Sequence, residues 1–156
     1  MGRRTGAVLV SLLLLLTLAV SASAAAVKMT VGVRFWRESG DKESMADSAV
    51  DTTREATLTR QPNGTFTLEL PVKQLSSMNM TGRLTGIAIG EVNYDGTLSG
   101  DLSDGTAVLT LKNLPASVLT SSDSNKALAV TCSIKMDTIL LGDISTSAKM
   151  SIWVER

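Results

Sequence analysis

The sequence predicts an all-β protein, an immunoglobulin-like β-sandwich of seven to eight strands. Apolar and polar residues alternate with a period of two over most of the chain, which is typical of half-buried strands. The dipeptide Asn63-Gly64 separates two such runs, and Asn-Gly readily adopts the positive φ angles of a hairpin turn. No segment after the N-terminal leader has the residue spacing of a long helix.

The expected strands follow one another along the chain. In the first strand, Met29, Val31, Val33 and Phe35 share one face, while Trp36 lies on the other face among polar residues. The second and third strands form a hairpin around the Asn-Gly turn. The expected strands cover residues 28–36, 56–60, 65–72, 84–89, 97–102, 107–111, 128–136 and 148–154, with a short turn at 114–119 and a polar loop at 121–125.

The first 26 residues are typical of a secretory signal peptide. A positive start at Arg3-Arg4 precedes an apolar run at 7–20, and the small residues at 22–24 suit a signal peptidase. A membrane anchor is the alternative interpretation, but a span needs about 20 apolar residues and this run is shorter. We therefore expect a cleaved leader at 1–26.

Cleavage after Ala24 or Ala26 would leave a single domain at 27–156 that is secreted, either extracellular or at the cell surface. The full chain has 15 basic and 15 acidic residues, and loss of Arg3 and Arg4 leaves 13 basic residues against those 15 acidic ones. Without a basic patch, nucleic acid and an anionic membrane surface are poor candidate partners.

The chain contains no histidine, one cysteine and one tyrosine. Histidine is the usual acid–base group near neutral pH and the commonest metal ligand. A Ser-His-Asp or Cys-His catalytic site and a Cys/His zinc site are thereby excluded. Cys132 has no partner for an internal disulfide and lies in an alternating run, which favours a small core residue. We expect a binding protein and not an enzyme.

The segment after the first strand carries a resemblance. It is polar at Glu38–Glu43, continues with Ser44-Met45-Ala46, and leads to the hairpin Asn63–Leu70. This order is similar to the opening of a NEAT domain, the haem-binding module of bacterial iron acquisition. In that family a first strand, a short helical lip with Ser-Met-Ala and a Thr- and Leu-rich hairpin follow one another. The family fold is an immunoglobulin-like sandwich, in agreement with the strand pattern.

The resemblance implies a haem site between the lip and the last hairpin. Ser44 would bond a propionate or face the distal side of the haem, and Met45 would pack on the porphyrin. The family usually takes its iron ligand from a Tyr-x-x-x-Tyr motif in the last hairpin, but residues 137–147 contain no tyrosine. Methionine sulfur is another haem ligand, and Met136 and Met150 flank this hairpin. Both also continue apolar strand faces, which is typical of core residues.

Trp36 lies beside the lip on the polar face of the first strand. It either lines a ligand groove or a protein interface, or covers the edge of the sandwich. Taken together, the sequence predicts a secreted NEAT-like module that binds haem or a haem-carrying protein, with other cell-surface iron-uptake proteins as further partners. The alternative is a non-catalytic protein-interaction module of the same fold that binds no haem.

Overall fold

The computed structural model describes residues 24–156 except 78, 139 and 141. Strands and short 3-10 helices account for all regular structure in this part of the chain, which confirms the predicted all-β class. The elements are β1 (Val27–Arg37), η1 (Met45–Ala49), β2 (Ala56–Arg60), β3 (Phe66–Pro71), β4 (Leu75–Ser77), β5 (Met80–Ile89), β6 (Val92–Asp95), β7 (Thr97–Ser99), β8 (Val108–Leu114), η2 (Ala116–Val118), η3 (Ser124–Lys126), β9 (Leu128–Met136) and β10 (Asp143–Val154).

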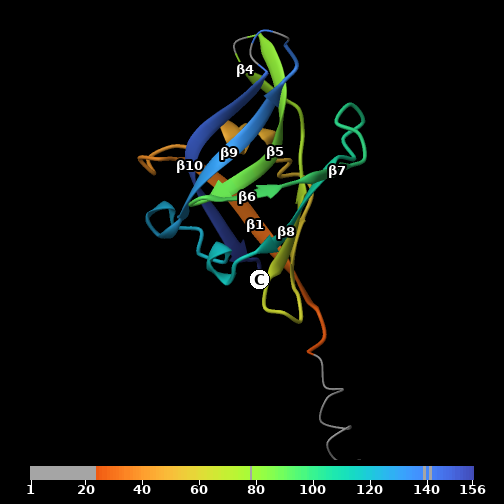
Figure 1. The fold of residues 1–156 in the computed structure, drawn as a ribbon, viewed down its shortest axis with the longest axis vertical. Helices are drawn as coiled ribbons and strands as arrows, with labels where there is room; N and C mark the ends of the chain where they lie inside the picture. The colour runs from red at the N-terminus through yellow and green to blue at the C-terminus, as the bar shows by residue number, and fades with distance from the viewer. Residues whose placement is uncertain (1–23, 78, 139, 141) are drawn as a thin grey trace, which may run out of the picture.

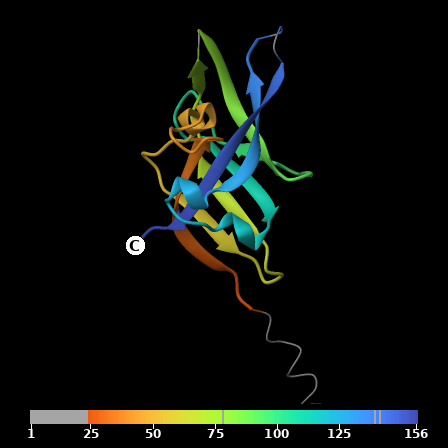
Figure 2. The same ribbon diagram turned by 90° about the vertical axis from the view of Figure 1, so that its left-hand side faces the viewer.

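All pairings between these strands are antiparallel, in the order β4-β5-β9-β10-β1-β2-β3-β8-β7, and β6 adds to β5. The sheet curls so that the half containing β5, β9 and β10 lies over the half containing β2, β3 and β8 (Figures 1 and 2). Both β5 and β6 contact β8, so the two ends of the sheet approach each other. The result is the predicted sandwich.

Apolar side chains fill the space between the two halves. In β1 the residues with odd numbers point inward, and Val31, Val33 and Phe35 are at most 7% exposed. In β9 and β10 the residues with even numbers point inward. All buried apolar residues of the described chain form one core cluster, and burial of such side chains is the main source of stability of the folded state.

The sequence missed the short strands β4 and β6, which have three and four residues, and β6 contains no buried residue, so no alternation marks it. Strand β7 covers only the first three residues of the strand expected at 97–102. The strand expected at 84–89 begins earlier, at Met80, because Gly82 lies inside β5 opposite Met136 and does not end the strand. Similarly, β10 starts at Asp143 and not at residue 148.

The predicted leader at 1–26 lies mostly outside the described residues and stays a prediction. Strand β1 begins at Val27, and every residue of the described core falls between Val31 and Ile152. Within residues 24–156, apart from the three gaps, no helix is long and apolar enough to cross a membrane.

Candidate functional site

The segment Ser44–Ala49 forms a short 3-10 turn where the sequence resemblance implies a lip, and we use the name lip for this segment. The Oγ atom of Ser44 accepts a hydrogen bond from the N–H of Ala46 at 3.2 Å, which caps the first turn of η1. Ser44 is 7% exposed, so this cap is buried. The N–H of Asp47 donates to Ser44 C=O and the N–H of Val50 to Asp47 C=O, both at 3.0 Å. These bonds fix a single short turn between β1 and β2.

Two hydrogen bonds attach this lip to β1. The N–H of Phe35 donates to Oδ1 of Asp47 at 2.8 Å, and the N–H of Ser44 donates to the C=O of Phe35 at 2.8 Å. Burial raises the pKa of Asp47, while the bond from Phe35 and the charge of Arg34 oppose this rise. The lip is therefore anchored to the strand through both backbone groups of Phe35, and it also contacts β4 and β5.

Half-buried apolar side chains surround this end of the sandwich. Met45 on η1, Met80 on β5 and Ile144 on β10 all pack against the core and keep part of their surface exposed. Met80 is on β5, which contacts η1, and Ile144 is on β10, which is separated from β5 by β9. A Cβ atom on Gly82 would approach Met136 Sδ to 2.8 Å, so the glycine leaves the space that this sulfur occupies. We call the group Met45, Met80, Met136 and Ile144 the lip cluster.

The structure places the two hairpin methionines in the core. Met136 is 5% exposed and Met150 is 0% exposed. Met150 lies opposite Phe35 in the β1–β10 register, well inside the sandwich. Both methionines are at inward-facing positions of their strands, as expected for core residues. Neither sulfur is accessible to a ligand.

Trp36 does not lie with the lip cluster, because it is on the outer face of β1. Its indole N–H donates to Oγ of Ser151 at 3.0 Å, and the guanidinium carbon of Arg34 lies 5.5 Å from its ring centroid. Such a distance is typical of a cation–π contact.

Of the five residues expected at the site, the structure brings Ser44 and Met45 together at η1, with Met136 in the lip cluster but buried. It places Met150 and Trp36 elsewhere.

Other groups with potential chemistry are also buried or remote. Tyr94 is on β6, opposite Ile87 of β5, and it packs against the core. Burial raises the pKa of the Cys132 thiol to about 12, which fits a core residue and not a nucleophile. In the described part of the chain, no three His, Cys, Asp or Glu residues are grouped so as to hold a metal ion.

Sequence reasoning missed Met80 as a strand residue and Ile144 altogether. Ile144 is followed by Thr146 and Ala148 on the same face, so a period of two does continue through the polar stretch before residue 148. Only one large apolar side chain marks that stretch, and this signal is too weak to extend the strand.

Comparison with known proteins shows a likeness in structure but none in sequence. No protein-family model matches the chain, and no curated protein is similar to it in sequence. Among solved structures, the chain is similar to a mutant of IsdX2-NEAT5 in complex with haem, with a TM-score of 0.53 and 12% sequence identity. The match covers 85% of this chain and 98% of the other. The chain therefore has a NEAT-like, immunoglobulin-like fold.

Proposed function

We propose that this domain is a secreted, non-catalytic module that binds haem at the lip cluster. The observation that carries the proposal is the position of Met45, Met80 and Ile144, three half-buried apolar side chains at one end of a NEAT-like sandwich. A flat macrocycle gains most of its affinity from apolar contact, with a few polar groups that orient its edge. The haem present in the similar structure supports the choice of ligand.

The polar contribution would come from Ser44. Its oxygen accepts the bond from Ala46, and a hydroxyl that accepts one bond still has its own hydrogen to donate. A propionate at the edge of the porphyrin is a suitable acceptor, because a hydrogen bond to a charged oxygen is stronger than a neutral one. Ser44 would then fix the orientation of the haem while Met45 contacts its face.

Met45 is also the residue suited to reach the iron. Thioether sulfur is an established haem ligand type, and Met45 keeps part of its side chain exposed whereas Met136 and Met150 are in the core. We therefore propose macrocycle contact as the main source of affinity and Met45 as the iron-side residue.

A titration with two porphyrins tests the proposal. The protein without its leader is mixed with haemin and, separately, with metal-free protoporphyrin, and the visible absorption is recorded. We expect saturable changes with both, since apolar contact does not require iron, and an additional Soret change with haemin that Met45→Ala removes. Met29→Ala is the matched control, because Met29 is also half-buried but lies on β1 opposite Leu58. No saturable change with either porphyrin would refute haem binding.

The second candidate is a protein-interaction module of the same fold, with a haem-carrying protein or other iron-uptake proteins as partners. The outer face of β1 and β10 favours it, because Trp36 and Trp153 both lie there half-buried with Arg34 between them. Tryptophan and arginine are enriched at the centres of protein interfaces. A negative porphyrin titration combined with binding of haemin-loaded haemoprotein would favour this candidate.

A further inference from the structure

At Val33 the edge of β1 is open. The backbone groups of the odd-numbered residues of β1 point away from β10: Val31 pairs with Ala56 at the end of β2, and Phe35 is bonded to the lip. Between these two positions, no described group bonds the N–H or C=O of Val33, which is 7% exposed. A peptide group without a protein partner is costly unless water or a ligand bonds it.

A cavity of ≈ 230 Å³ borders this edge. The loop from Val50 to Ala56 forms one wall, and Trp153 of β10 contributes to another. The indole of Trp153 lies against Gly32, where a Cβ atom would come within 2.3 Å of the ring. Pockets for drug-sized ligands measure about 300–1000 Å³, so this cavity suits a group of the size of one amino-acid residue and is too small for haem.

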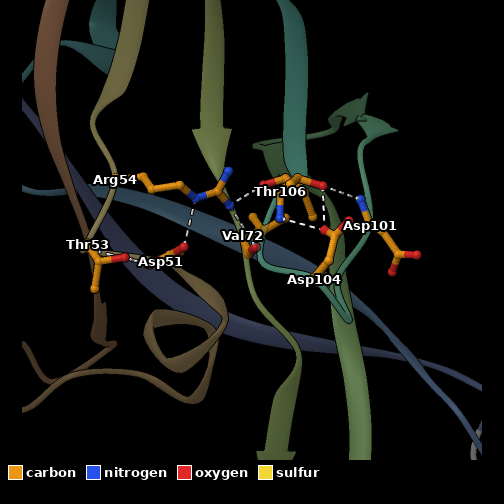
Figure 3. Close-up of polar contacts among 8 residues, drawn as sticks. Asp51, Thr53, Arg54, Val72, Asp101, Asp104 and Thr106 are labelled. Atoms are coloured by element: carbon orange, nitrogen blue, oxygen red, sulfur yellow. Dashed lines mark hydrogen bonds and ion pairs between the residues drawn. The ribbon is translucent and has the colours of Figure 1, made fainter.

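The cations around the cavity already have partners. The Arg54 guanidinium bonds Oδ2 of Asp51 at 2.8 Å and the C=O of Ala107 at 2.6 Å, with a third bond to Val72 (Figure 3). Arg34 lies 3.4 Å from Glu43, which is outside the cavity.

Two carboxylates at the cavity, those of Glu55 and Glu155, have no cationic partner among the described residues. Both residues are exposed. The lining therefore carries an excess of negative charge next to an indole, and a cation gains from both groups.

We propose that this cavity binds one basic residue of an extended partner polypeptide. The backbone N–H and C=O of this basic residue would pair with the C=O and N–H of Val33, as when a strand adds to a sheet edge. Its Lys or Arg side chain would lie on Trp153 between Glu55 and Glu155. The open peptide group selects an extended backbone, and the unpaired carboxylates select the cation. The site is independent of haem binding and gives the protein-interaction face of the domain a defined position.

Amide chemical shifts of the 15N-labelled protein without its leader test this inference, in the absence of porphyrin. The probes are N-acetyl-lysine-N-methylamide, the same compound with norleucine, and butylammonium. We expect the lysine probe to shift the Val33 amide and the Trp153 indole N–H saturably, with a dissociation constant on the order of 1 mM for so small a ligand. The norleucine probe lacks the charge and butylammonium lacks the peptide group, so each should bind at least about 5-fold more weakly.

The variant Glu55→Gln/Glu155→Gln should bind the lysine and norleucine probes equally, whereas Glu91→Gln, an exposed glutamate in the β5–β6 turn, should behave as the unaltered protein. No saturable shift at Val33 with the lysine probe would overturn the inference. Equal binding of norleucine by the unaltered protein would reject the cation, and equal binding of butylammonium would reject the backbone pairing.

Discussion

The indole N–H of Trp36 donates a 3.0 Å hydrogen bond to Oγ of Ser151 across the β1–β10 pair. Ser151 is completely buried although it belongs to the outer face of the sheet. The indole thus lies along the sheet, with the guanidinium of Arg34 over its ring. Trp36 therefore packs against the outer face of the β1–β10 pair.

Replacement of Ser151 by alanine should destabilise the protein by about 1 kcal/mol, because the indole N–H loses its acceptor. The urea midpoint of unfolding, followed by tryptophan fluorescence, measures the change. Ser145→Ala is the control, since Ser145 is an exposed residue of the same strand. An equal loss in both variants would show that the bond contributes nothing beyond β-propensity.

Asp51 makes stability depend on pH in the acid range. Hydrogen bonds from Thr53 and Arg54 lower the pKa of its carboxyl to about 2, so its charged form stabilises the folded state. This contribution is complete above the ordinary pKa of 3.8 and is lost as the pH falls from there through about 2. Asp51→Asn should therefore have a lower melting temperature than the unaltered protein at pH 7, and the difference should vanish near pH 2.

Asp47 should behave in the opposite sense. Burial raises its pKa, so the folded state favours the protonated form and the carboxyl stabilises folding less as the pH rises from 3.8 through the raised value. Asp47→Asn keeps an oxygen for the N–H of Phe35 and removes the charge. Its melting temperature relative to the unaltered protein should increase with pH over that interval. A change in the same direction as for Asp51→Asn would contradict the assigned pKa shifts.

Cys132 should be chemically inert in the folded protein. Its side chain is 0% exposed and its pKa is raised to about 12, so the reactive thiolate is scarce and inaccessible. Ellman's reagent at pH 8 should give no colour in native buffer and one equivalent of thiol in concentrated urea. Rapid reaction of the native protein would show that β9 opens locally or that Cys132 lies elsewhere.

The sequence could predict the strands that are half-buried. β1, β2, β3, β8 and β9 bury one face each, so their apolar residues alternate and the pattern is visible without a structure. The short strand β6 lacks buried residues, and no local signal separates it from a loop, whereas β7 is the first part of the strand expected at 97–102.

The positions Ser44 and Met45 follow from the family resemblance and not from local chemistry. The structure places them at the short turn after β1, where Ser44 caps η1. The roles of Met136 and Met150 depend on which strand face turns inward and how deeply, which tertiary packing decides. The open edge at Val33 likewise arises because β2 begins only at Ala56, opposite Val31, a feature of register that no residue pattern reveals.

A haemin titration of two variants on adjacent positions of β10 tests the central claim most directly. Ile144 belongs to the lip cluster, whereas Ser145 is exposed on the other face of the same strand. A glutamate at position 144 would put a charge against the porphyrin, so Ile144→Glu should weaken haemin binding at least about 10-fold, which corresponds to about 1.4 kcal/mol. Ser145→Glu should bind as the unaltered protein does. Equal haemin affinity of both variants, with cooperative urea unfolding retained, would contradict a haem site at the lip cluster.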